Sequence, residues 1–463
     1  MKRFSFGAVE RPVRVAIVGA GPSGFYAAES LLKRAGISIR VDMLDRLPTP
    51  FGLVRGGVAP DHQKIKAVTT IYTRVAEMPG FRFFGNVMLG RDISIEDLKG
   101  NYDQIIYAVG NESDRKMRIP GEELIGSCPA TEFVGWYNGH PEHKEHVFDL
   151  SVERVAVVGV GNVAMDVTRI LSRRPDELED SDISHYALEA LRESRVREIL
   201  ILGRRGFAQA SFTTKEIKEI AELSGVDLII DPSEVVLDQL SEGDLSDANC
   251  RRNVEFLTDQ SKLGEGVEPK KVKLRFLVSP VEILGRNGRV EAVRIEKNEL
   301  YRDESGTSKP RGKNEFETLE VGMVLRSVGY RGVPIPGVPF DQNLGRIPNE
   351  SGRVTDEGDN RIEGQYVVGW AKRGPTGLIG TNRRDSIITV DSMLKDLKGK
   401  TAKGLPKGEE EAFPGMLRER GVRFVAFEDW KRLNGFEIER GREKGKIREK
   451  FTTITEMYKA LDQ

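Results

Sequence analysis

The stretch VAIVGAGPSGFYAAESLL, from Val15 to Leu32, joins an apolar strand, a glycine-rich turn and the start of a helix. Gly19, Gly21 and Gly24 have the spacing G-x-G-x-x-G. The first glycine allows the tight turn, the second lets backbone N–H groups approach a pyrophosphate, and the third lets the helix pack closely on the strand. The amino end of the helix adds positive partial charge. The stretch therefore predicts a dinucleotide-binding turn.

The surrounding sequence supports this interpretation over a purely structural glycine turn. A strand is expected at 14–19, a helix at 23–34 and a second strand at 40–44, which together make a βαβ unit of a parallel sheet. Asp45 follows the second strand, where an acid can hold ribose hydroxyls. Because an acid disfavours a phosphorylated ribose, FAD or NAD is the expected ligand.

The same pattern returns in VAVVGVGNVAMDVTRIL, from Val155 to Leu171, with Gly159, Gly161 and Ala164 at the key positions. The next strand, 198–202, ends at Arg204 and Arg205 instead of an acid. Two guanidinium groups there bind a 2′-phosphate, so the pattern predicts NADP rather than NAD. A helical insertion at 175–195 lengthens this unit, and the alternative is that both arginines are ordinary surface charges.

Other segments complete the outline of an α/β chain. QIIYAVG at 104–110 and MVLRSVG at 323–329 are expected to be strands at crossings between domains. Residues 272–284 and 289–296 are expected to be antiparallel strands around the turn GRNG. A helix is expected at 385–397. The charged run GREKGKIREK near the carboxyl end is expected to be solvated surface.

Composition excludes several classes of protein. The 463 residues include 71 Lys and Arg against 72 Asp and Glu, which argues against binding to nucleic acid or to an anionic membrane. No apolar run is long enough to span a bilayer, and no signal or transit peptide is evident. Cys128 and Cys250 lie far apart without a CxxC motif, which suits a reducing cytoplasm. A monomer is expected.

Further motifs resemble the adrenodoxin reductase type of ferredoxin–NADP reductase. The most specific are PFGLVRGGVAPDHQKIK and GWAKRGPTGLIGTNRRDS, and IPGEEL, FTTKEI and SVGYRG occur in the family's order. The resemblance implies two Rossmann-like, glutathione reductase-like domains, with the NADP domain inserted into the FAD domain. The expected boundaries are 1–110 and 327–463 for the FAD domain, the latter including a charged extension, and 111–326 for the NADP domain.

The resemblance also implies cofactor contacts at particular residues. FAD contacts would fall on Ser23, Asp45, Leu53, Val87, Trp370, Gly377, Leu378 and Ile379. NADP contacts would fall on Val160, Gly161, Asn162, Val163, Arg204, Arg205, Glu216 and Gly377. The chain departs from the family at Asp45, where glutamate is more usual, and at Leu378, where valine or another apolar residue occurs.

The implied activity is electron transfer between NADPH and a ferredoxin-type iron–sulfur protein. A flavin suits this task because it accepts a hydride and releases electrons singly. His62 is a candidate to donate to the flavin or relay a proton, and Glu216 to pair with it or hold the nicotinamide amide. Neither is expected to be essential, and a structural histidine is the alternative. Trp370 either packs beside the flavin or belongs to the core.

Three rival functions are weaker. A flavin-dependent monooxygenase is favoured by FVGWYNGH, but one residue too many separates Gly135 from His140. An electron-input subunit of a larger complex would carry an amino-terminal cysteine cluster, which is missing. A non-catalytic nucleotide sensor is the third. His140, His143 and His146 are read as surface histidines and not as a metal site. Basic residues considered for partner docking are Arg251, Arg252, Lys372, Arg373, Arg383 and Arg384.

Overall fold

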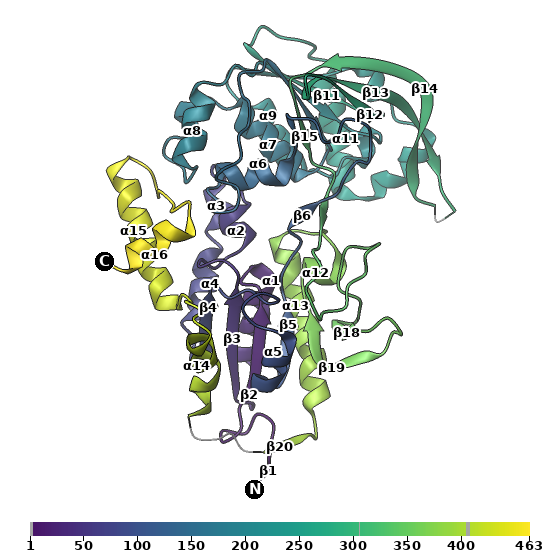
Figure 1. Ribbon diagram of the computed structural model, residues 1–463. Helices are drawn as coiled ribbons and strands as arrows, with labels where there is room; N and C mark the ends of the chain where they lie inside the picture. Colours follow the sequence, from purple (N-terminus) through teal and green to yellow (C-terminus); the bar gives the residue numbers. More distant parts are fainter. Residues whose placement is uncertain (1–2, 305, 404–407) are drawn as a thin grey trace.

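The computed structural model describes residues 3–304, 306–403 and 408–463. Two sheets with their covering helices form two bodies, one above the other in Figure 1. We call the body around the seven-stranded sheet the lower body, and the body around the six-stranded sheet the upper body. Segments before and after the upper body share the lower sheet, so the predicted fold class, with one dinucleotide unit inserted into the other, is confirmed.

The lower sheet has the order β17-β18-β19-β5-β2-β3-β4, parallel from β19 to β4. Its strands are β2 (Val13–Val18), β3 (Ile39–Asp45), β4 (Phe81–Gly85), β5 (Gln104–Tyr107), β17 (Asn349–Glu350), β18 (Arg353–Thr355) and β19 (Arg361–Val367).

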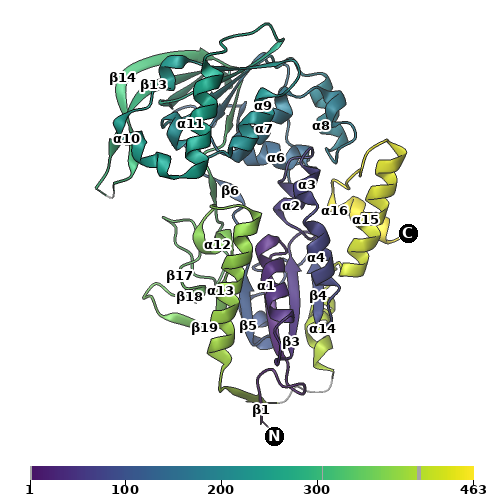
Figure 2. The same ribbon diagram turned by 180° about the vertical axis from the view of Figure 1, so that it is seen from behind.

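Both faces of the lower sheet are buried, which explains its continuous apolar strands. Val15 and Ile17 of β2 pack on one side, and Ala16 and Val18 pack on the other. The first side carries α1 (Pro22–Leu32), α4 (Thr69–Ala76) and α13 (Ile379–Leu397), and the second carries α5 (Ile95–Asn101) and α14 (Ala412–Glu419). Figure 2 shows α13 alongside α1.

The upper sheet is wholly parallel, in the order β10-β11-β9-β8-β15-β7. Its strands are β7 (Ser127–Pro129), β8 (Arg154–Val158), β9 (Glu198–Leu202), β10 (Val226–Ile230), β11 (Lys270–Arg275) and β15 (Met323–Arg326). One face is covered by α6 (Ala130–Tyr137), α7 (Asn162–Ser172), α8 (His185–Arg192), α9 (Thr214–Ala221) and α11 (Ala248–Ser261). The other is covered by an antiparallel sheet of β12 (Val278–Arg286), β13 (Arg289–Arg302) and β14 (Ser308–Glu320).

The chain passes between the bodies twice, and the two passages pair with each other. β6 (Ser113–Asp114) and β16 (Tyr330–Arg331) form a two-stranded antiparallel sheet. Both strands follow closely on the segments expected at the crossings. Four helices of four residues each are α2 (Leu53–Gly56), α3 (Gln63–Lys66), α10 (Gln239–Glu242) and α12 (Trp370–Arg373). Separately, β1 (Arg3–Ser5) pairs with β20 (Thr401–Lys403).

Two local predictions need correction. Residues 272–284 are not one strand, because β11 belongs to the parallel sheet and β12 to the antiparallel one. The chain turns between them at Leu277, which has a φ of 55°, a left-handed value that a sequence pattern cannot reveal for leucine. The helix expected at 385–397 begins six residues earlier, at Ile379.

The prediction that the carboxyl-terminal charged run is solvated holds only for part of it, since residues 442–445 are exposed. α15 (Phe427–Glu443) packs on the lower body through Trp430 and Leu433, and α16 (Ile454–Leu461) joins the same core through Met457. Within the charged run, Lys446, Glu449 and Lys450 are buried. Lys446 Nζ donates to the Ile183 carbonyl of the upper body at 2.6 Å. The segment therefore touches both bodies, as its position in Figure 1 indicates.

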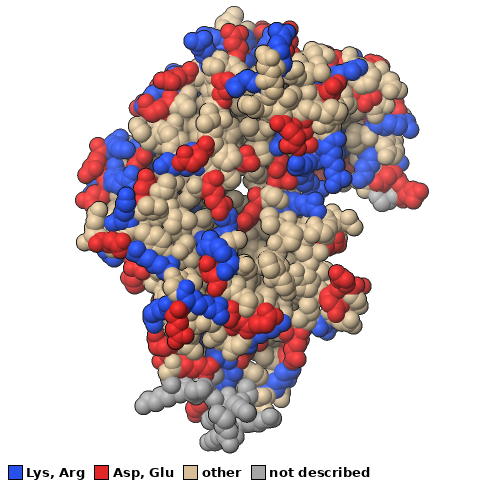
Figure 3. Space-filling model, viewed as in Figure 1, with Lys and Arg blue, Asp and Glu red and all other residues tan. Residues whose placement is uncertain are grey.

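Acidic and basic residues are interleaved over the face seen in Figure 3, in keeping with the nearly balanced composition. Among the residues that the structure describes, no helix is both long and apolar enough to cross a bilayer.

Candidate functional site

The first glycine turn has the geometry that its spacing predicts. Gly19 has a φ of +107°, and a Cβ there would lie 2.5 Å from the Ala108 carbonyl oxygen. A Cβ on Gly24 would lie 2.3 Å from the Gly19 carbonyl oxygen, so α1 packs directly on the turn. At Gly21 a Cβ would meet no atom within 4 Å. The turn is tightly packed at Gly19 and Gly24 and open at Gly21, at the amino end of α1, as a diphosphate cradle requires.

Asp45 lies at the end of β3 and binds the backbone around this cradle. Its Oδ2 accepts a hydrogen bond from Ala20 N at 2.8 Å, and its Oδ1 accepts one from Leu47 N at 2.9 Å. Burial raises the pKa of Asp45 to about 6, although both hydrogen bonds oppose the rise. Asp45 thus fixes the turn itself, and its role toward a ribose stays a prediction.

Distant segments converge on the amino end of α1. A Cβ on Gly52 would lie 2.9 Å from Gly21 Cα, which places the Leu53 segment beside the cradle. A Cβ on Gly369 would lie 2.5 Å from Ser23 Oγ, which places the Trp370 segment there too. Ser386 Oγ of α13 donates to the Ser23 carbonyl at 2.9 Å.

Val87 also joins this region. Its backbone N donates to the Asp45 carbonyl at 2.8 Å. Gly377, Leu378 and Ile379 form the amino end of α13, next to α1. The structure therefore gathers around one cradle most of the residues that the resemblance assigns to FAD.

The side chains around the first cradle fit a large, partly apolar ligand. Leu53 is 40% exposed and Leu378 is 61% exposed, although both are apolar. Trp370 Nε1 is buried without a hydrogen-bond acceptor among the described residues, and its ring lies 5.3 Å from that of Tyr330. An indole N–H in this condition favours a ligand over simple core packing.

The second glycine turn is built in the same way. Gly159 has a φ of +125°, and a Cβ there would lie 2.2 Å from the Ser327 carbonyl oxygen. The Val160 carbonyl accepts hydrogen bonds from Ser211 N at 2.9 Å and Phe212 N at 3.1 Å. At the start of α7, Asn162 Oδ1 accepts from Thr213 N at 2.8 Å. Val160 and Asn162 are thus tied to the loop at 211–213, where the FTTKEI motif begins, and a Cβ on Gly161 would lie 3.4 Å from Ser211 Oγ.

Arg204 and Arg205 follow β9, in the loop that begins at Gly203. Arg204 is exposed and Arg205 is half-buried. Neither guanidinium lies within 4.0 Å of a carboxylate of the described residues. Burial and the charge of Arg204 lower the pKa of Arg205. Two neighbouring cations left without acidic partners are suited to binding an anion.

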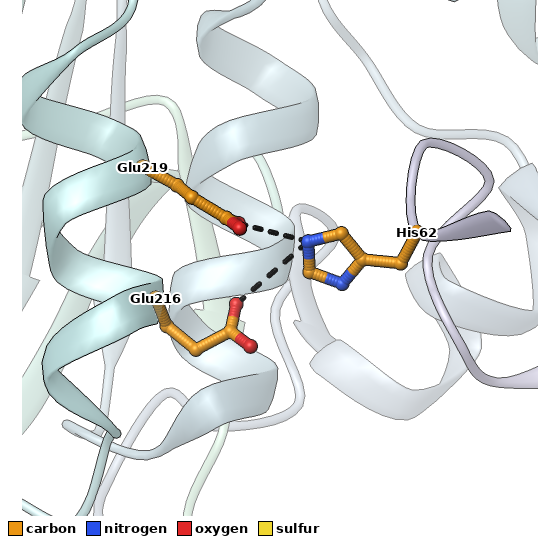
Figure 4. A group of neighbouring side chains, drawn as sticks. All are labelled: His62, Glu216 and Glu219. Carbon is orange, nitrogen blue, oxygen red and sulfur yellow. Dashed lines mark hydrogen bonds and ion pairs between the residues drawn. The ribbon is translucent and has the colours of Figure 1, made fainter. Parts of the chain in front are cut away.

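The two bodies meet at His62, which precedes α3. Figure 4 shows Glu216 and Glu219 reaching from α9 toward its ring. His62 Nε2 lies 2.8 Å from Glu219 Oε2 and 4.0 Å from Glu216 Oε2. The carboxylate nearest to His62 is therefore Glu219, which was not among the residues named from the sequence, while Glu216 lies at the outer limit of an ion pair. The repeat KEIKE could have revealed Glu219, since residues three apart share one face of a helix.

A buried arginine holds this cluster together. Arg169 of α7 is fully buried and lies 2.7 Å from Asp61, 2.7 Å from Asp166 and 3.2 Å from Glu216. Burial raises the pKa of Asp61, but hydrogen bonding and charge from Arg169 outweigh it and lower that pKa to about 2.

The pKa values of the two glutamates of α9 are shifted in opposite directions. Burial and the nearby Asp166 raise the pKa of Glu216. At Glu219, burial raises the pKa, but the hydrogen bond and the charge of His62 outweigh burial, so the pKa is lowered. Glu219 is thus poised as an anion beside His62, and Glu216 is better able to hold a proton. The ligand atoms of His62, Glu216 and Glu219 lie within 4.8 Å of one another. A metal ion is nevertheless disfavoured there, because the positive charge of Arg169 already pairs with both glutamates.

Several residues weighed from sequence lie elsewhere. Phe133, the first residue of the monooxygenase-like motif, is buried in α6 and stacks on Trp136. His140 and His143 are half-buried, not on the surface, and burial lowers the pKa of His140 to about 3. Lys372 is largely buried and pairs with Asp385 at 2.8 Å, so it is poorly placed for docking a partner.

Comparisons with known proteins agree with this geometry. The profile of the pyridine nucleotide-disulphide oxidoreductase family matches residues 13–222. The chain is 45% identical over 457 residues to NADPH-ferredoxin reductase FprA of Mycobacterium tuberculosis, covering 96% of this chain and 98% of that protein. It is 41% identical to the human mitochondrial NADPH:adrenodoxin oxidoreductase, covering 98% and 93%. The solved structure of Mycobacterium tuberculosis FprA in complex with NADPH has a TM-score of 0.93 at 43% identity, covering 98% of this chain and 100% of that one.

Proposed function

The chain belongs to the family of NADPH-ferredoxin reductases and adrenodoxin reductases, and we propose that it transfers electrons between NADPH and a ferredoxin-type iron–sulfur protein. The observation that carries this proposal is the pair of glycine cradles, one in each body, joined by the contact between His62 and α9. Bound FAD would supply the redox chemistry, because a flavin accepts two electrons as a hydride and returns them singly.

FAD would lie in the first cradle. Gly19, Gly21 and Gly24 leave room for its diphosphate, Ser23 lies at the amino end of α1, and Asp45 is the acceptor nearest the ribose. Leu53, Val87, Trp370 and the segment 377–379 would enclose the rest. The open space over Gly21 and the unpaired indole N–H support this assignment.

NADP would lie in the second cradle. Residues 160–163 would bind its diphosphate at the amino end of α7, and Arg204 with Arg205 would bind the 2′-phosphate. Glu216, for which burial favours the protonated form, would hold the nicotinamide carboxamide. Gly377 has a φ of +80° and no side chain, so its backbone would approach both ligands.

The chain's own groups orient and screen the reacting atoms. His62, whose Nε2 faces Glu219 and whose Nδ1 faces Arg169, would hold its ring between the bodies and close the site to water. Hydride transfer itself needs no acid or base, so His62 tunes the rate. We assign 1–110 and 327–463 to the FAD domain and 111–326 to the NADP domain, which sheet membership supports. We further propose a monomer, and a cytoplasmic location that the two free cysteines, Cys128 and Cys250, favour.

The proposal is tested with the purified protein and iron–sulfur proteins of the same cell. The protein should retain FAD, be bleached anaerobically by NADPH much faster than by NADH, and reduce one of those ferredoxins in steady state. Colourless protein that takes up no flavin would refute the proposal. Oxygen consumption coupled to hydroxylation of a substrate would favour the monooxygenase instead.

A further inference from the structure

The loop that carries the two arginines is held by its carbonyl groups. Gly203 O accepts a hydrogen bond from Val278 N at 3.0 Å, and Arg205 O accepts one from Leu277 N at 3.1 Å. Between them, Arg204 O accepts from the side chain of Asn298, whose Nδ2 lies 2.8 Å away. Three consecutive carbonyls are thus tied to the start of β12 and to β13, and only the middle one depends on a side chain.

Asn298 is directed at this loop by the shape of β13. The register with β14 shifts between Glu296 and Asn298, which marks an irregularity of the kind that turns a side chain toward a new partner. Asn298 is only 6% exposed. Because a carbonyl oxygen can only accept, the amide nitrogen must face Arg204, and its second hydrogen reaches Ser279 Oγ at 2.8 Å.

The backbone of Asn298 strengthens the same clip. Its N–H donates to the Leu277 carbonyl at 2.7 Å, and Leu277 in turn donates to Arg205 O. Leu277 holds a left-handed φ of 55° in this arrangement. Asn298 therefore supports both arginines, one through its side chain and the other through Leu277, while their guanidinium groups stay free of carboxylate partners among the described residues.

We propose that Asn298 is a positioning residue that sets the preference for a 2′-phosphorylated dinucleotide by fixing the backbone of Arg204 and Arg205. The inference rests on the proposed NADP site. Arginine side chains are long and flexible, so the direction of their backbone decides whether both reach one phosphate together. Releasing the Arg204 carbonyl should weaken phosphate binding and leave the diphosphate cradle intact.

The test uses Asn298→Leu, which has similar size but no donor, and Asn298→Ser, which is too short to reach Arg204 and cannot overpack. Ser279→Ala is the matched control, because it removes the other partner of the same amide. Binding of 2′,5′-ADP and 5′-ADP to each FAD-loaded protein is measured by calorimetry, with KM and kcat for NADPH and NADH alongside.

Both Asn298 variants should bind 2′,5′-ADP roughly fivefold to twentyfold more weakly, the scale of one lost hydrogen bond between neutral groups inside the protein. In both variants, the affinity for 5′-ADP and the kcat and KM for NADH should stay unchanged. Ser279→Ala should bind both probes as the wild type does. Unchanged 2′,5′-ADP binding, or equal losses for both probes, would overturn the inference. If Arg204→Ala with Arg205→Ala abolishes the preference but the Asn298 variants keep it, only this inference fails. A wild-type protein without any preference would refute the NADP site as well.

Discussion

Lys450 Nζ, from the carboxyl-terminal segment, lies 2.9 Å from Asp182 Oδ2 of the upper body. Lys66 Nζ, from α3, lies 2.7 Å from Oδ1 of the same carboxylate. Two ammonium groups of the lower body thus hold one buried carboxylate of the upper body. This contact, with the bond from Lys446 to Ile183, links the bodies on the side opposite to β6 and β16 in Figure 1.

Asp182→Asn should therefore destabilise the protein more than Lys450→Met. The first change leaves two buried ammonium groups facing each other, at a cost of about 3–5 kcal/mol. The second keeps the pair of Lys66 with Asp182, and burial already lowers the pKa of Lys450, so less is lost. Urea unfolding of the FAD-loaded proteins compares them. Equal costs would mean that Asp182 is not the shared anchor.

His62→Ala should slow reduction by NADPH roughly threefold to tenfold, which is less than the 10²–10⁴ typical of an obligatory acid or base. In the proposed function the ring orients and screens the reacting atoms, and hydride transfer itself needs no acid or base. Glu219→Leu should produce a similar change, because it removes the 2.8 Å partner of His62 Nε2. Stopped-flow reduction across pH measures both. Complete loss of bound FAD in His62→Ala would contradict the assignment.

Arg204→Ala combined with Arg205→Ala should raise KM for NADPH by at least about 100-fold, given roughly 1.5–3 kcal/mol for the charged hydrogen bond lost at each arginine. KM for NADH should change little, since NADH has no 2′-phosphate. Arg286→Ala with Arg289→Ala, on the turn between β12 and β13, is the matched control for lost charge. Steady-state kinetics with both nucleotides decides the matter, and equal losses would refute the phosphate role.

Asp61→Asn should destabilise the protein at neutral pH but progressively less in acid. The folded-state pKa of Asp61 is lowered from 3.8 to about 2, so its contribution is present above pH 3.8 and declines as the pH falls toward 2. The shift corresponds to about 2 kcal/mol. Urea midpoints between pH 6 and 3 measure the difference from wild type. Asp259→Asn, an exposed carboxylate on α11, should show no such trend, and a gap that stayed constant with pH would count against the Arg169 pairing.

Much of the fold was predictable because local patterns report local structure. β9 at 198–202 has the predicted bounds, and β2 and β3 begin and end within one residue of prediction. The break at Leu277 was not predictable, because leucine rarely adopts a left-handed φ. The turn is required here because β11 and β12 belong to different sheets. The contact of Glu219 with His62 was not predictable either, because it depends on which face of α9 meets the lower body.

The sequence by itself determined the two glycine turns, the acid after one and the arginines after the other, because each needs only neighbouring residues. The tertiary structure alone decided how Asn298 reaches Arg204, how Arg169 gathers carboxylates from two bodies, and why Lys446 and Lys450 are buried in a run that looks solvated. Burial and charge pairing depend on what lies across a contact, and no spacing along one chain contains that information.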